Sequence, residues 1–156
     1  MRYGSRVANP APPFARLSLI DRLFNGLIGA LVGLGVGPAH MRVLEVRGRK
    51  SGKLYTLPVD LLSHQGKTYL VAPRGNTQWV RNAEASAVVT LRRGKQAERY
   101  RLRPLANAEK PPIIKAYLDT FRREVQRFFP VPAGSPIDAF VPLAERYPAF
   151  ELQREP

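Results

Sequence analysis

The stretch Val43-Leu44-Glu45-Val46-Arg47-Gly48-Arg49-Lys50-Ser51-Gly52-Lys53-Leu54-Tyr55-Thr56-Leu57-Pro58-Val59 predicts how this chain folds. Two runs of strand-forming residues flank a short polar segment, and glycines punctuate the link between them. We therefore expect a tight strand-to-strand turn that carries four cationic side chains and one hydroxyl. Its glycines let backbone N–H groups approach a ligand closely, which suits a phosphate or a polycarboxylate. Taken alone, the turn is also compatible with a solvated basic hairpin.

Outward from this hairpin, the pattern predicts an α+β fold made of short strands and a few packing helices. We expect strands at residues 41–47, 53–62, 68–72, 87–92, 97–104 and 149–153, and helices at residues 19–34, 77–84, 111–129 and 137–146. Mostly adjacent strands with tight turns indicate an antiparallel barrel covered by helices. We divide the chain into an N-terminal arm and apolar helix, residues 1–40, and a barrel domain, residues 41–156.

The charge of the chain is concentrated in its middle. The formal net charge is +13, and residues 42–103 hold 14 of the 25 Lys and Arg but only 4 of the 12 Asp and Glu. Such a field attracts anionic ligands, which include nucleic acids, membrane surfaces and phosphorylated small molecules. The chain has no cysteine, which excludes disulfides and thiolate chemistry and is compatible with a cytoplasmic protein.

The N-terminal region contains a 15-residue apolar run, residues 23–37. It is shorter than the roughly 20 residues that a membrane-spanning helix needs. A signal peptide is also disfavoured, because no basic region directly precedes the run and no small-residue cleavage site follows it. We therefore favour a helix that is buried or that contacts a membrane peripherally through residues 19–37, with a signal peptide and a span as the less favoured alternatives.

A second segment, Val71 to Asn82, predicts a strand that ends in a Gly/Asn loop and leads into a short helix. The first N–H groups of such a helix can receive an anion or a polar ring edge. Trp79 is the only tryptophan and, taken alone, is better explained as a core aromatic. Neither the two histidines nor the acids show metal-ligand or paired-carboxylate spacing. We therefore expect no metal and no catalytic side chain, and a protein that positions a cofactor.

In order and spacing, these segments resemble the deazaflavin-dependent nitroreductase family, small split-β-barrel proteins that use coenzyme F420. The pieces that carry the resemblance are Gly48–Lys53 with Pro58, Tyr69–Ala72, Gly75 with Trp79 and Asn82, Val88–Leu91, and Tyr147–Leu152. No single piece is specific, but together they cover about residues 42–105 with an echo at the C-terminus. The resemblance implies an antiparallel split β-barrel like those of flavin reductases and pyridoxamine-phosphate oxidases.

The resemblance also implies roles for twelve residues. Arg49, Lys50, Ser51, Gly52 and Lys53 would hold the phosphate and acidic tail of the coenzyme. Ala72, Pro73, Arg74 and Gly75 would lie against the deazaflavin ring, largely through backbone groups, and Trp79, Arg81 and Asn82 would bracket the ring and tail. The implied activity is an oxidoreductase that transfers hydride from F420 to a quinone-like or nitro substrate. The coenzyme carries a phosphodiester and several carboxylates, which match the positive middle of the chain.

Two alternatives stay open at this level. One is an FMN-binding, flavin-reductase-like barrel. The other is a non-catalytic basic module that presents arginines to nucleic acid or anionic lipid; nucleic acid is the less favoured partner, because Tyr100 is the only aromatic interleaved with the basic run. The sequence leaves the oligomeric state unknown.

Overall fold

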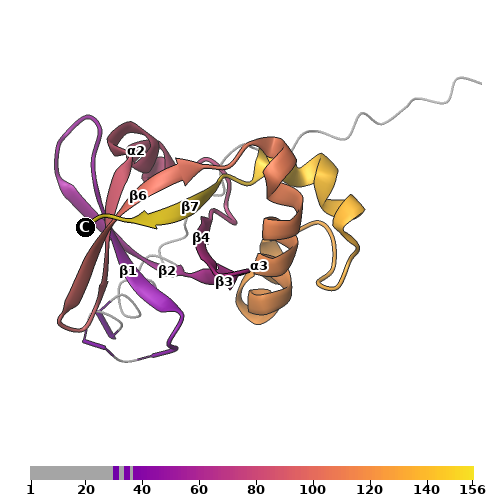
Figure 1. Cartoon of the computed structure of the whole chain (residues 1–156), viewed down its shortest axis with the longest axis horizontal. Coiled ribbons are helices and arrows are strands. Elements are labelled where there is room, and N and C mark those ends of the chain that lie inside the picture. Colours follow the sequence, from indigo (N-terminus) through magenta and orange to yellow (C-terminus); the bar gives the residue numbers. More distant parts are fainter. Residues whose placement is uncertain (1–29, 32–33, 36) are drawn as a thin grey trace, which may run out of the picture.

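A seven-stranded antiparallel sheet curls on itself in the computed structural model, which describes residues 30–31, 34–35 and 37–156 (Figure 1). The strands are β1 (Met41–Arg47), β2 (Leu54–Asp60), β3 (Leu62–His64), β4 (Lys67–Val71), β5 (Val88–Arg93), β6 (Gln96–Pro104) and β7 (Ala149–Arg154). Their order in the sheet is β2-β1-β5-β6-β7-β4-β3. The predicted antiparallel split barrel with packing helices is confirmed.

The two edges of the sheet are joined where β2 ends and β3 begins. The sequence pattern predicts one strand over residues 53–62, but the ladder changes partner at Leu61, so that β2 pairs with β1 and β3 pairs with β4. The N–H of Leu61 bonds to the carbonyl of His40 at 2.9 Å. Because β2 and β3 are consecutive in the chain yet lie at the two ends of the strand order, the chain itself links the two edges of the sheet.

Helices cover both ends of the barrel. They are α2 (Gln78–Ser86), η1 (Asn107–Glu109), α3 (Lys110–Val125), η2 (Gln126–Phe128) and η3 (Ile137–Arg146). The predicted helix over residues 111–129 is α3 followed by the 3-10 turn η2, with non-helical backbone at Phe121. The helix predicted at residues 137–146 has these bounds but is a 3-10 helix. One apolar cluster lies inside the barrel under α2, and a second lies between α3, η3 and strands β3 and β4.

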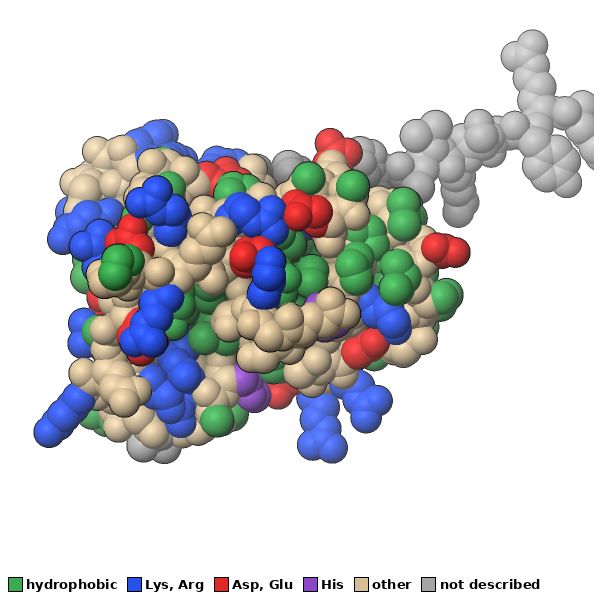
Figure 2. Space-filling model, in the orientation of Figure 1, with side chains coloured by type: hydrophobic (Ala, Val, Ile, Leu, Met, Phe, Trp, Pro, Cys, Tyr) green, Lys and Arg blue, Asp and Glu red, His purple; other side chains and the backbone are tan. Residues whose placement is uncertain are grey.

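The surface separates into two regions. In Figure 2, Lys and Arg side chains lie mainly over the barrel, whereas hydrophobic side chains gather over the helical end. Two of the exposed hydrophobic residues, Ile137 and Val141, belong to η3. Among the described helices, none is long and apolar enough to cross a membrane.

Most of the predicted N-terminal arm and helix lies outside the described residues. At residues 37–38, the chain is held by the guanidinium of Arg93, which donates hydrogen bonds of 2.8 Å to the carbonyls of Gly37 and Pro38. The backbones of Gly35 and Gly94 are also in contact, since a Cβ added at Gly94 would lie 3.5 Å from the Gly35 Cα. Val43 pairs with Arg92, so the chain enters the barrel at the β5–β6 turn. This turn lies at the end of β1 away from the turn at residues 48–53, about 20 Å along a seven-residue strand.

Candidate functional site

The predicted basic turn links β1 to β2 and is held tightly by its own backbone. The N–H of Gly48 bonds to the carbonyl of Lys53 at 2.8 Å, and the N–H of Gly52 bonds to the carbonyl of Gly48 at 2.9 Å. Gly52 has a φ of +68°, in the left-handed region that favours glycine. Arg47 donates a 3.1 Å hydrogen bond to the carbonyl of Gly52 from outside. The turn is thus a preformed loop.

Helix α2 joins this turn to the second predicted segment. Asn82, buried at 6% exposure, accepts hydrogen bonds at its Oδ1 from the backbone N–H of Arg49 (3.1 Å) and from the Arg49 Nη1 (2.8 Å). The same Nη1 donates to Oε1 of Gln78 at 2.9 Å. Two segments that lie 33 residues apart in sequence therefore form one site.

Arg49 differs from most other arginines of the barrel in the chemistry of its partners. It is held by two neutral amides, whereas Arg42, Arg47 and Arg93 bond to backbone carbonyls and five of the arginines on the strands are held by carboxylates. These pairs are Arg92 with Glu45, Arg99 and Arg101 with Glu155, Arg103 with Glu151 and Glu109, and Arg154 with Glu98. An amide fixes the position of a guanidinium but does not neutralise its charge. The positive charge of Arg49 is therefore available to an anionic ligand.

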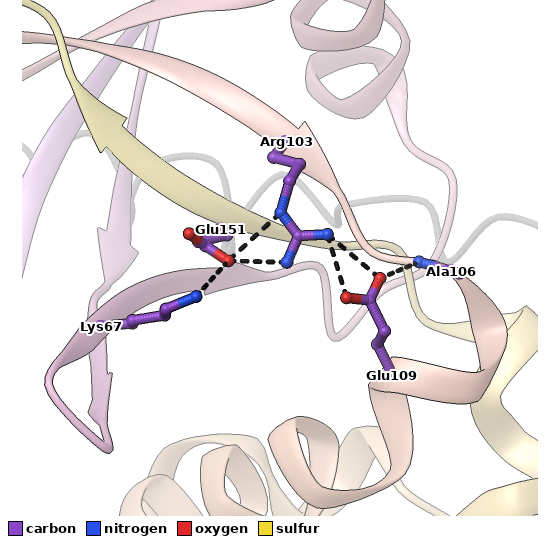
Figure 3. A network of polar contacts seen from close by, with 5 residues as sticks. All are labelled: Lys67, Arg103, Ala106, Glu109 and Glu151. Carbon is purple, nitrogen blue, oxygen red and sulfur yellow. Dashed lines mark hydrogen bonds and ion pairs between the residues drawn. The ribbon is translucent and has the colours of Figure 1, made fainter.

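Figure 3 shows the contrasting arrangement around Arg103. Its guanidinium lies between Glu151, at 2.6 Å, and Glu109, at 3.0 Å, and Lys67 reaches Glu151 from the other side at 3.4 Å. The hydrogen bonds from Arg103 and Lys67 hold the pKa of Glu151 below its ordinary value, in spite of burial. The network ties β4, β6, β7 and η1 together. All of its charges are matched, so it is a structural network.

The remaining polar side chains of the turn divide into two groups. The Oγ of Ser51 accepts a hydrogen bond from the backbone N–H of Lys53 at 3.2 Å and lies 3.5 Å from the hydroxyl of Tyr55. The Ser51 hydroxyl therefore stabilises the turn itself. The side chains of Lys50 and Lys53 are exposed and form no ion pair or hydrogen bond with any residue in the described part of the chain. Two uncompensated ammonium groups therefore stand beside Arg49.

The second predicted segment follows β4 as a tight loop. Ala72 is buried, and its N–H bonds to the carbonyl of Pro148 at 2.9 Å. Gly75 is buried with a φ of +83°, and its N–H bonds to the carbonyl of Ala72 at 3.1 Å. Pro73 is half-buried between them. The guanidinium of Arg74 lies 4.7 Å from the centre of the Phe128 ring.

The start of α2 adds an aromatic and an unmatched polar atom. Trp79 is half-buried, packs on the barrel core, and lies 6.3 Å from the ring of Phe150. Arg81 is half-buried on the same helix. The Oγ1 of Thr77, at the N-cap, is buried and has no hydrogen-bond partner among the described residues. A buried hydroxyl without a partner costs free energy, so this atom marks a locally unsatisfied point at the start of α2.

Two residues of the site are missing from the sequence-based prediction. Gln78 stands four residues before Asn82 in α2, and residues at this spacing share a helix face, so this signal could have found it. Phe128, which lies beside Arg74, comes from η2, and no local pattern links the two. Within the described residues, no group of three or more His, Cys, Asp or Glu could hold a metal ion.

The fold is that of a small split β-barrel protein, and the basic turn meets α2 at one end of the barrel. Within this class, the F420H(2)-dependent quinone reductase family matches residues 20–124, and the chain belongs to that family of oxidoreductases. As its name states, this family depends on reduced coenzyme F420. No curated protein is similar enough in sequence to count as a relative.

Solved structures support the fold. The structure described as F420-H2 Dependent Reductase (FDR-A) has a TM-score of 0.50 at 20% identity, covering 76% of this chain and 97% of its own. Protein Atu2129 of Agrobacterium tumefaciens, of unknown function, has a TM-score of 0.54 at 18% identity, covering 94% of this chain and 60% of its own. HutZ, the heme storage protein of Vibrio cholerae, has a TM-score of 0.50 at 13% identity, covering 75% and 82%. At these identities, the likeness is one of fold.

Proposed function

We propose that this protein binds coenzyme F420 across the basic turn and the loop at residues 72–75, and reduces a quinone-like or nitro acceptor. The observation that carries the proposal is the set of uncompensated cations: Arg49 is held by amides, and Lys50 and Lys53 have no carboxylate partner among the described residues. These cations match the phosphodiester and carboxylates of the coenzyme tail. The chain's membership in the F420H(2)-dependent quinone reductase family supports the same coenzyme.

The ring of the coenzyme is assigned to the loop after β4. The buried Ala72 and Gly75 and the half-buried Trp79 give this loop mainly apolar and backbone groups. This is the usual make-up of a cofactor site. When bound, the reduced deazaflavin supplies a hydride to the acceptor. The residues of this chain orient the ring and exclude water, and none of them is required to react.

The alternative of a basic module that binds nucleic acid has weaker support. Arg92, Arg99, Arg101 and Arg103 are paired with carboxylates, and Arg93 is bonded to backbone carbonyls. A phosphate backbone would have to displace these partners. The FMN alternative is best tested directly, because FMN would occupy the same loop and turn.

The test is a titration of the purified full chain with F420, read as quenching of Trp79 fluorescence. We expect saturable quenching with a dissociation constant in about the micromolar range or below, a free energy near −8 kcal/mol. FMN and a duplex DNA serve as matched anionic competitors. Absence of F420 binding, or displacement of F420 by DNA at equal phosphate concentration, would overturn the proposal.

We also propose peripheral membrane contact through residues 19–37. Its support is the apolar composition of this segment together with Leu31 and Leu34, which are 42% and 77% exposed. The double substitution Leu31→Asp and Leu34→Asp should lower the partition constant for phosphatidylglycerol vesicles by about 100-fold or more, since burial of each leucine contributes about 1.5–3 kcal/mol. Val141→Asp, at a residue 58% exposed on η3, is the control and should float like the wild type. Equal flotation of all three proteins would contradict the membrane contact.

A further inference from the structure

Gln78 controls one end of the Arg49 side chain. It is the first residue of α2, and its Oε1 accepts the Nη1 of Arg49 at 2.9 Å. The Oδ1 of Asn82, one helical turn further on, accepts the same Nη1 at 2.8 Å. Asn82 also fixes the backbone of Arg49 by accepting its N–H at 3.1 Å. The Nη1 end of the guanidinium is therefore held at two points and the main chain at a third.

The opposite edge of the guanidinium makes no such contact. The Nε and Nη2 groups of Arg49 form no hydrogen bond with the residues that the structure describes. Together, these groups are the two parallel donors that arginine uses to bind both oxygens of a phosphate or carboxylate. Arg49 is also exposed, so an anion can reach this edge.

We infer that Gln78 is a positioning residue that holds Arg49 with its Nε–Nη2 edge directed to a two-oxygen anion, the phosphodiester of the coenzyme tail. This inference rests on the proposed function. It adds a residue that does not itself need to touch the coenzyme, and it assigns a bidentate contact to Arg49.

The neutral amide at position 78 matters for two separate reasons. It restrains a long side chain before the ligand arrives, which lowers the entropy lost on binding. It also leaves the charge of Arg49 uncompensated, whereas a glutamate at position 78 would neutralise it. The carboxylate partners of Arg92 and Arg103 illustrate that second case.

Two variants of Gln78 separate these reasons. Gln78→Met removes the restraint and should raise the dissociation constant of F420 about 2- to 10-fold, the effect of freeing one rotamer-rich side chain. Gln78→Glu keeps the restraint but pairs the charge, and should weaken binding by about 10-fold or more at low salt. The difference between Gln78→Glu and the wild type should shrink as salt rises, because salt screens exposed charges.

Unfolding temperature provides a readout that separates this role from a structural one. A carboxylate at the first position of a helix interacts favourably with the helix dipole, so Gln78→Glu should be as stable as the wild type or slightly more stable. Gln96, an exposed glutamine about 20 Å away at the β5–β6 turn, provides matched controls. Gln96→Met and Gln96→Glu should leave the affinity within about 2-fold of the wild type.

The outcomes separate failure of the positioning role of Gln78 from failure of F420 binding by the protein. If the wild type binds F420 and both Gln78 variants bind it with unchanged affinity, the positioning role is overturned while the proposed function stands. If the affinity of each variant falls only in proportion to a loss of fold stability, Gln78 is structural and the inference also fails. If the wild type does not bind F420, both the inference and the proposed function fail.

Discussion

Arg49→Ala is expected to weaken F420 binding by about 1.5–3 kcal/mol, the range for hydrogen bonds to charged groups. The substitution removes the Nε–Nη2 edge and leaves the amides of Gln78 and Asn82 without their partner. The loss should appear as a rise in the dissociation constant measured by Trp79 quenching. Arg49→Lys should rescue little of it, because an ammonium cannot make the parallel bidentate contact.

Arg101→Ala is the matched control for the loss of one positive charge. Arg101 is 65% exposed on the same barrel but is paired with Glu155 at 3.3 Å. Its removal should change the affinity by no more than a few tenths of a kcal/mol, the scale of an exposed ion pair. If Arg49→Ala and Arg101→Ala weaken binding equally, the turn acts only through the general electrostatic field of the protein, and the proposed direct contact of Arg49 with the coenzyme is wrong. Lys50→Ala should follow Arg49→Ala in direction and size.

Phe150→Ala is expected to lower the free energy of unfolding by about 3–5 kcal/mol, as is typical when a buried phenylalanine is truncated. Phe150 is 1% exposed on β7, and its ring lies 6.3 Å from that of Trp79. The loss should be measured by urea unfolding, followed by both circular dichroism and Trp79 fluorescence. Because Trp79 loses its support, its emission should also shift before the global transition.

Gln153→Ala, an exposed position on the same strand, is the control and should change the free energy of unfolding by less than about 0.5 kcal/mol. Phe150→Leu should recover most of the loss, since it leaves a smaller cavity. A loss below about 1 kcal/mol for Phe150→Ala would show that the barrel core collapses around the missing ring. In that case, the packing of Trp79 would depend on other contacts.

Local patterns predict most of the strands of this protein. The hairpin at residues 41–60 follows from strand-forming runs on either side of two glycines, and β5 and β6 follow from the Arg93-Gly94-Lys95 turn. The single strand predicted over residues 53–62 is wrong at Leu61, because a change of hydrogen-bonding partner leaves no mark in hydrophobic periodicity. Likewise, hydrophobic periodicity predicts a helix at residues 137–146 but not its 3-10 geometry; η3 contains Pro142, which cannot donate a helical hydrogen bond.

The candidate site illustrates the same division. The basic turn, the Gly75–Trp79–Asn82 segment and the excess of positive charge can all be read from the sequence, because each depends on residue type and short spacing. That Asn82 and Gln78 hold Arg49, and that carboxylates match the arginines of β6 and Arg92 of β5, became visible only in the folded chain. The physical reason is that a cation becomes available to a ligand when no acid lies within hydrogen-bonding distance, and that distance is set by strands and helices far apart in the chain.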